Sequence, residues 1–268
     1  MYTSFKDSIS KFSFADKSHL FAWVNLITDK NPPQSTDIFK LHGASNVVYI
    51  SQGNNHGYYI EGDYDIVVSI RGTMMQNPIT YLEDIEAALG ADTTEDNKLG
   101  FYKAADNIWS QLEGLLRAAP QKTLWLTGHS LGAAASLIVA LKIVSDKTLP
   151  QIKELYTYGC PRTLNKEQLA LLPPSVLTHY RWVNNADVIT TLPPTFEGYH
   201  HHGDEWYLNY WGNVRTLTTW QRIKDQWRGV LAGFKHGKLD PAIDHLIMHY
   251  VTRLHKYSEG KEFPQDKL

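Results

Sequence analysis

One short segment constrains the fold of this 268-residue chain more than any other. Gly128-His129-Ser130-Leu131-Gly132 stands between a run of apolar character at 123–127 and an alanine- and leucine-rich run at 133–144. The first run is typical of a buried parallel strand, and the second favours a helix. A serine flanked by glycines between a strand and a helix is the pattern of a nucleophile elbow, because glycines avoid clashes in the tight turn. The sequence therefore predicts that Ser130 is a nucleophile presented above a sheet.

The rest of the chain alternates between strand and helix patterns. Strands are predicted at 46–51, 57–61, 65–70, 123–127, 154–158 and 179–183, and helices at 16–30, 79–89, 101–119, 133–144 and 240–254. This alternation predicts an α/β fold around a mostly parallel sheet with helices on both faces. The strands at 57–61 and 65–70 are predicted to form a hairpin that adds an antiparallel part to the sheet. We expect one domain over residues 1–268.

Composition excludes several classes of protein. The chain has 26 Lys and Arg against 28 Asp and Glu, a formal charge of -2, so it lacks the basic surface of a nucleic-acid binder. Its single cysteine, Cys160, excludes an internal disulfide. Charged residues interrupt the first twenty positions, so no Sec-type signal peptide is predicted. We expect a cytoplasmic protein, with export without a cleaved signal as the alternative.

A serine nucleophile needs a histidine base and a carboxylate that orients the histidine. In α/β-hydrolases these residues follow in the order Ser, Asp or Glu, His. Downstream of Ser130, Asp187 comes directly after a predicted buried strand, and His245 lies near the end of the chain. The carboxyl end of a parallel strand is where an acid is delivered to such a site. The sequence thus predicts Ser130, Asp187 and His245 as catalytic residues.

Seven segments in order resemble the class 3 lipase family of α/β-hydrolases, which includes fungal triacylglycerol lipases and feruloyl esterases. They are VVSIRGT at 67–73, LGFYKAA at 99–105, LTGHSLGAAASL at 126–137, YTYGCPRTLN at 156–165, RWVNNADVITTLPP at 181–194, the HHG-E-W run at 201–206, and Asp244-His245. The resemblance implies an α/β-hydrolase fold and ester hydrolysis by the Ser130, Asp187 and His245 set. It also implies that Thr73 and Leu131 are the oxyanion residues and that the reaction needs neither a metal nor a cofactor.

Two segments without a clear family motif bear on the substrate. Residues 74–80 occupy the place of the lid of the fungal lipases, and Met74 and Met75 supply adaptable apolar surface there. Residues 213–240 carry a stripe of tryptophans and aliphatic residues with basic residues between them, as in a cap or an interfacial helix. Trp227 belongs to this stripe and is predicted, with Met74 and Met75, to bind substrate. The resemblance implies a small-molecule or lipid ester as substrate and transient contact with a lipid surface.

Other residues offer rival assignments, for which structural roles are expected. His200, His201 and His202 with His179 could suggest a metal site, but a fourth ligand and its geometry are not given by the sequence. Further alternatives are His249 and His236 as the base, Asp204 as the acid, Asp244 beside the base, Asp84 in the 79–89 helix, and Cys160 as a nucleophile.

The sequence predicts a lipase that acts on acylglycerols or phospholipids. The alternatives are a short-chain or aryl esterase of the feruloyl type, and a catalytically silent lipase-like binding protein, since fold alone does not fix function.

Overall fold

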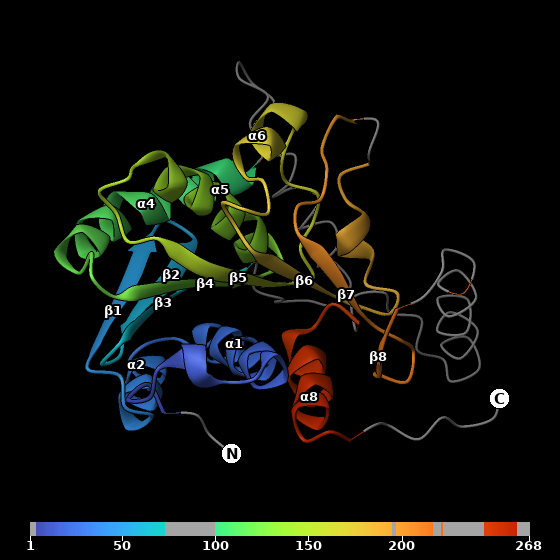
Figure 1. Cartoon of the computed structure of the whole chain (residues 1–268), viewed down its shortest axis with the longest axis horizontal. Coiled ribbons are helices and arrows are strands. Elements are labelled where there is room, and N and C mark those ends of the chain that lie inside the picture. The colour runs from blue at the N-terminus through green and yellow to red at the C-terminus, as the bar shows by residue number, and fades with distance from the viewer. Residues whose placement is uncertain (1–3, 73–99, 195–196, 217–220, 222–243, 262–268) are drawn as a thin grey trace.

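A computed structural model describes residues 4–72, 100–194, 197–216, 221 and 244–261. Its centre is an eight-stranded sheet in which the strands lie in chain order from β1 to β8 (Figure 1). Neighbouring strands from β1 to β3 are antiparallel, those from β3 to β7 are parallel, and β8 is antiparallel to β7. The predicted α/β fold around a mostly parallel sheet is confirmed.

The strands are β1 (Asn46–Gln52), β2 (Asn55–Glu61), β3 (Asp65–Ile70), β4 (Thr123–His129), β5 (Ile152–Tyr158), β6 (His179–Asn184), β7 (Asp204–Leu208) and β8 (Val214–Arg215). β2 and β3 form the predicted hairpin. β1 joins β2 in a second hairpin, whose turn contains Gly53 with φ +59°. β7 and β8 are short and were not predicted, because charged residues interrupt the apolar pattern of β7 and β8 has only two residues.

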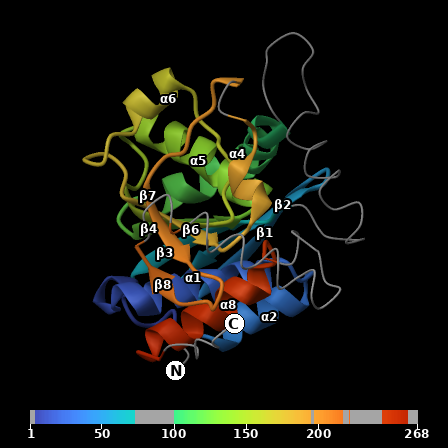
Figure 2. The ribbon, with the colours of Figure 1, turned by 90° about the vertical axis from the view of Figure 1, so that its right-hand side faces the viewer.

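The helices lie in two layers. They are η1 (Ile9–Lys11), α1 (Phe14–Thr28), α2 (Gln34–Leu41), α4 (Gly100–Ala118), α5 (Leu131–Ser145), α6 (Lys166–Leu171), η2 (Val188–Thr191) and α8 (Ile247–Ser258). α4, α5 and α6 lie above the sheet in Figure 1, whereas α1, α2 and α8 lie below it; Figure 2 shows the same layers from the side. The sheet therefore has an apolar core on each face.

The middle of the sheet is buried from both sides. Every residue of β3 is buried, as are all residues of β4 after Thr123. On one face Trp125 packs against Phe21 of α1, with ring centroids 5.8 Å apart, and on the other Leu126 joins the core beneath α4 and α5. This two-sided burial explains why the predicted strand at 123–127 lacks polar alternation.

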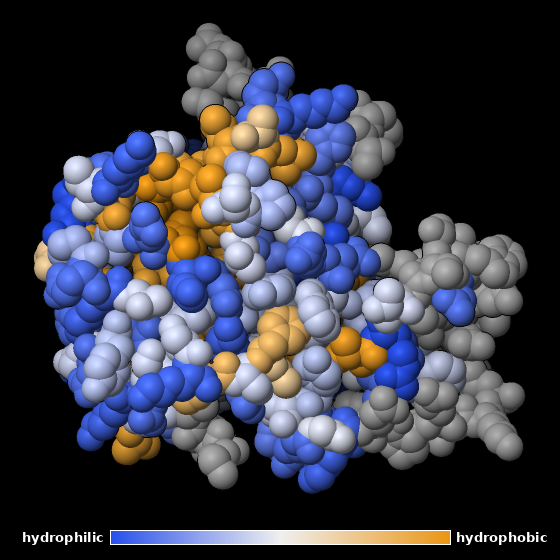
Figure 3. All heavy atoms as spheres, in the orientation of Figure 1, coloured by the Kyte–Doolittle hydropathy of each residue, from blue (hydrophilic) through white to orange (hydrophobic). Residues whose placement is uncertain are grey.

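Helix α5, which follows the Ser130 turn, is apolar on nearly all sides. Most of its residues are buried, but Leu131, Leu141 and Val144 are only partly covered. Figure 3 shows apolar surface gathered on this side of the sheet, over the region of α4 to α6. Packing against the core therefore holds α5 in place.

The last helix differs from its prediction. A helix was predicted over 240–254, but α8 begins at Ile247, and residues 240–243 lie outside the described part of the chain. Leu246 has extended backbone angles, and the carbonyl and side chain of Asp244 accept hydrogen bonds from Asn184, the last residue of β6, and from Asn185. Residues 244–246 thus form a loop before the helix, and this loop carries His245.

Candidate active site

The turn between β4 and α5 holds Ser130 in a strained conformation. Its φ is +57° and its ψ is −128°, which few residues other than glycine adopt. The Ser130 N–H donates to the carbonyl of Tyr158 on β5, over 3.0 Å. Such strain at a strand-to-helix turn is typical of a nucleophile elbow.

The two glycines of the motif are required by close backbone contacts. A Cβ on Gly128 would lie 2.3 Å from the carbonyl oxygen of Gly132, and a Cβ on Gly132 would lie 2.0 Å from that of Ile70. Gly72, after β3, also approaches the turn closely, because its Cβ would lie 3.0 Å from Ser130 Cβ. The segment that leads into Thr73 therefore packs directly on the nucleophile turn.

Asp187 and His245 form a buried pair. Asp187 follows β6 and caps η2 by accepting a hydrogen bond from the N–H of Ile189. His245 Nδ1 lies 2.8 Å from Asp187 Oδ1 and 2.9 Å from Oδ2, and both side chains are fully buried. Since the carboxylate accepts from Nδ1, the neutral imidazole carries its lone pair on Nε2. This is the tautomer that can accept a proton from a serine.

A tyrosine that the sequence did not single out also contacts the acid. Tyr250 Oη, on α8, donates to Asp187 Oδ2 over 2.7 Å and accepts from the N–H of Asn184 over 3.1 Å. Burial raises the pKa of the Tyr250 hydroxyl, so it remains a donor. The signal for this contact is weak in the sequence, because Tyr250 reads as an ordinary core residue five positions after His245.

The environment keeps Asp187 ionised. Burial alone would raise its pKa, but the charge of His245 and the hydrogen bonds from His245 and Tyr250 outweigh burial. The net effect lowers the pKa of Asp187 below its ordinary value of 3.8. The carboxylate is therefore charged at neutral pH and can stabilise a protonated imidazole.

The loops that carry the acid and the base are hydrogen-bonded to each other. Asn184 Nδ2 donates to the Asp244 carbonyl over 2.6 Å, and Asn185 Nδ2 donates to Asp244 Oδ2 over 2.9 Å. The side chain of Asp244 thus binds the residues before Asp187. Asp244 therefore anchors the loop that carries His245 to the residues before Asp187.

Gly159 closes the site from the end of β5. Its φ is +59°, and a Cβ there would lie 2.6 Å from His245 Cε1 and 2.8 Å from Asp187 Oδ2. The backbone at this position therefore packs against both members of the pair, which leaves space for no side chain.

The remaining predicted residues are only partly described. Ser130 Oγ is buried and has no hydrogen bond to any described residue. Leu131 is the first residue of α5, where backbone N–H groups have no partner within the helix. Thr73, Met74, Met75 and Trp227 lie outside the described residues, as do Asp84 and His236.

The rival acid and bases are placed elsewhere. Asp204 begins β7, exposed and paired with Tyr180 at the start of β6, whereas Asp187 follows the end of β6. His249 lies in the first turn of α8, four residues after His245, and the ring hydrogen bonds of Asp187 go to His245. The geometry therefore favours Asp187 and His245.

The cysteine and the histidine cluster are held by structural contacts. Burial raises the pKa of Cys160 to about 11, so its thiol remains protonated. His179 and His202 lie 3.0 Å apart through their Nδ1 atoms, and their other nitrogens contact Thr157 Oγ1 and the Leu172 carbonyl. Across the described part of the chain, no three His, Cys, Asp or Glu side chains converge as metal ligands would.

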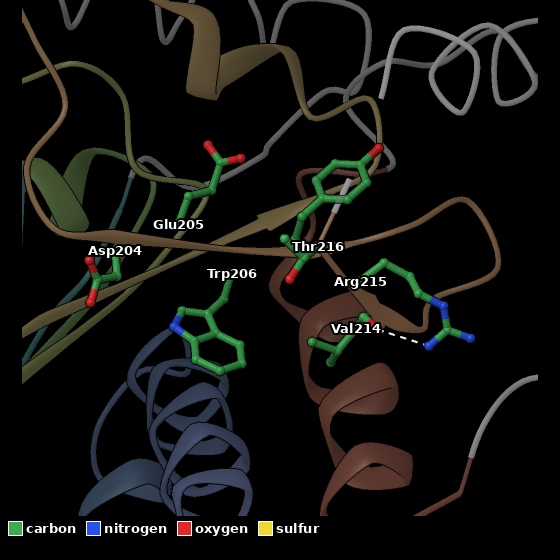
Figure 4. Close-up of a pocket in the computed structure, with 7 residues that line it drawn as sticks. Asp204, Glu205, Trp206, Val214, Arg215 and Thr216 are labelled. Atoms are coloured by element: carbon green, nitrogen blue, oxygen red, sulfur yellow. Dashed lines mark hydrogen bonds between the residues drawn. The ribbon is translucent and has the colours of Figure 1, made fainter. Parts of the chain in front are cut away.

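A hollow of about 400 Å³ lies at the β7–β8 edge, where Trp206 and Glu205 point to opposite sides of the sheet (Figure 4). Its lining comes from residues 204–207 and 214–216 and includes no member of the Ser130, Asp187 and His245 set. The hollow is therefore separate from the predicted catalytic residues.

Among the residues that the structure describes, no helix combines the length and apolar composition needed to cross a bilayer.

Comparison with known proteins adds a family match. The family model described as "Lipase (class 3)" matches residues 67–197, a range that includes β4, the Ser130 turn, α5 and Asp187. His245 lies beyond it.

Two curated relatives share part of the sequence. The secreted mono- and diacylglycerol lipase 1 of Fusarium solani is 30% identical over 167 residues, covering 57% of this chain and 47% of the relative. Toxin TseL of Vibrio cholerae is 32% identical over 107 residues, covering 38% of this chain and 16% of the toxin. The chain thus spans less than half of either relative.

A solved structure extends the likeness over nearly the whole fold. A triacylglycerol lipase whose catalytic centre is formed by a serine protease triad superposes with a TM-score of 0.59. The alignment covers 90% of this chain and 94% of the lipase at 16% identity. The chain therefore has the α/β-hydrolase fold that its sequence predicts.

Proposed function

Because the chain belongs to the class 3 lipase family, we propose that it is a serine hydrolase of carboxylic esters with a lipid ester as its substrate. The observation that carries this proposal is the buried Asp187–His245 pair beside the Ser130 turn. The ring of His129, the residue before Ser130, lies 4.6 Å from the ring of His245, centroid to centroid. The base is thus next to the nucleophile turn.

The proposed reaction has two steps. Ser130 Oγ attacks the ester carbonyl carbon while His245 Nε2 takes the hydroxyl proton. The N–H of Leu131 and the oxyanion residue Thr73 stabilise the tetrahedral oxyanion, and His245 then returns the proton to the departing alcohol. In the second step His245 takes a proton from the water that attacks the acyl-serine, and it returns this proton to Ser130 Oγ as the acyl–oxygen bond breaks and the carboxylic acid is released. Neither a metal nor a cofactor takes part in this scheme.

We propose acylglycerols as the substrate class. The relative from Fusarium solani is named a mono- and diacylglycerol lipase, which supports this choice over a short-chain or aryl ester. Residues 74–80 remain our proposed lid, residues 213–240 our proposed cap, and Met74, Met75 and Trp227 our proposed acyl-chain contacts. A catalytically silent binding protein is the alternative, although the paired Asp187 and His245 favour a hydrolase.

The substrate proposal is tested by hydrolysis rates over a series of acyl chain lengths, with monomeric and emulsified esters. We expect kcat/KM to be higher for emulsified long-chain acylglycerols than for soluble acetate or butyrate esters. Trp227→Ala and Met75→Ser should lower the long-chain rates much more than the acetate rates, because contacts at the ester carbonyl are kept. Equal losses on both kinds of ester would contradict a role in acyl-chain binding.

The stability of the fold at alkaline pH should depend on a second carboxylate. Burial raises the pKa of Asp29, at the end of α1, to about 7, although the charges of Arg71 and His245 act to lower it. Because folding raises this pKa above its value in the unfolded chain, the fold loses stability as the pH rises from about 4 through 7. Asp29→Asn should therefore raise the thermal unfolding midpoint at pH 8 and change it much less at pH 4. In the control Asp37→Asn, which removes an exposed carboxylate on α2, the midpoint should follow the wild type at both pH values; an unchanged midpoint of Asp29→Asn at pH 8 would exclude this role of Asp29.

Location is a further proposal. The Fusarium solani relative is described as secreted, which supports export of this protein rather than the cytoplasmic location expected from the sequence. Immunodetection in culture medium and in cell lysate, with a cytoplasmic enzyme as the lysis control, distinguishes the two.

A further inference from the structure

His129, the last residue of β4, contacts the backbone of the proposed base. Its Nε2 lies 2.6 Å from the carbonyl oxygen of His245. A carbonyl oxygen only accepts hydrogen bonds, so His129 Nε2 carries the proton and donates. The strand that ends at the nucleophile is thereby bonded to the loop that carries the base.

The two imidazole rings also pack together. Their planes are tilted by 31°, both side chains are buried, and the ring of Tyr250 lies 6.3 Å from that of His129. Burial and the nearby His245 together lower the pKa of His129 to about 3, although the hydrogen bond to the His245 carbonyl and the carboxylate of Asp187 act to raise it. His129 is therefore neutral at working pH, and its contact with the carbonyl oxygen places its one ring proton on Nε2.

We infer that His129 is a positioning residue, whose Nε2–H bond to the His245 carbonyl holds the base at the geometry needed for proton transfer from Ser130. This inference rests on the proposed function. Residues 244–246 form a loop, so the backbone of His245 is not fixed by helix hydrogen bonds. The bond from His129 fixes it relative to β4, the same strand that presents Ser130. A displacement of about 1 Å in a catalytic group can lower the rate by about 100-fold.

Two substitutions separate the hydrogen bond from the ring. His129→Phe keeps a ring but removes the donor, whereas His129→Gln removes the ring and keeps an amide donor near the position of Nε2. We expect kcat on a soluble ester to fall by about 10- to 100-fold in His129→Phe with little change in KM. His129→Gln should recover most of that loss. Tyr156→Phe is the control, because it removes a partly buried hydrogen bond to Glu154 within the neighbouring strand β5, away from the pair.

The outcomes distinguish the inference from the proposed function. Wild-type kcat in a folded His129→Phe variant, or equal losses in both variants, would overturn the positioning role. Absence of ester hydrolysis in the wild type would instead refute the proposed function. Nitrogen NMR of the wild type gives a test that needs no variant: His129 should be neutral and protonated on Nε2 down to about pH 4. Protonation on Nδ1 would overturn the inference.

Discussion

Ser130→Ala is expected to fold as the wild type does and to lose ester hydrolysis almost completely. The hydroxyl makes no hydrogen bond to a described residue, so its removal should cost little stability. Without the nucleophile no acyl-enzyme forms, and loss of one member of such a set lowers kcat by roughly 10⁴- to 10⁶-fold. The measurements are kcat on a soluble ester and the thermal unfolding midpoint. A folded variant that keeps more than a few per cent of the wild-type kcat would remove Ser130 from the mechanism.

The partners of Ser130 should behave in the same way. Asp187→Asn loses the charge that stabilises protonated His245, and His245→Ala loses the proton acceptor, so both variants should be nearly inactive. Asp187→Asn should also be less stable at neutral pH, because the lowered pKa of Asp187 stabilises the fold above about pH 4, an effect lost as the pH falls.

Gly159→Ala is the second substitution expected to have a large effect. The alanine methyl would lie 2.6 Å from His245 Cε1, 2.7 Å from its Nδ1 and 2.8 Å from Asp187 Oδ2. These contacts are shorter than van der Waals distances, so the pair must move. We expect kcat on a soluble ester to fall by about 100-fold or more, because proton transfer depends on the placement of the base.

A matched glycine separates this clash from backbone strain. Gly53, in the β1–β2 turn, has the same φ of +59°, but a Cβ there would meet nothing within 4 Å. Gly53→Ala should cost about 1 kcal/mol of stability and leave kcat unchanged. If Gly159→Ala kept the kcat of Gly53→Ala, the close packing of Gly159 on the pair would be irrelevant to activity.

The parts of the fold that sequence could predict are those set by local pattern. The apolar run of β4, the glycines around Ser130 and the alanines of α5 each favour the observed element. α2 and β7 were missed because their short segments mix polar and apolar residues, and contacts with the rest of the fold decide their structure. The start of α8 was misplaced because Asp244 is bound to Asn184 and Asn185, sixty positions earlier.

The same distinction applies to the site. Asp187 and His245 were chosen by their order and by resemblance, and the structure brings them within hydrogen-bond distance. Tyr250, His129 and Gly159 contact this pair through the packing of α8, β4 and β5 around one end of the sheet. No local sequence pattern predicts such contacts. Thr73, Met74, Met75 and Trp227 stay predictions, since they lie outside the described residues.

Covalent labelling with a fluorophosphonate, followed by peptide mapping, tests the central claim most directly, because this reagent forms a stable adduct with an activated serine. The account predicts one adduct per chain, on Ser130, formed in parallel with loss of ester hydrolysis and absent in Ser130→Ala. A folded, unlabelled wild-type protein, or an adduct on a different residue, would contradict the proposed mechanism.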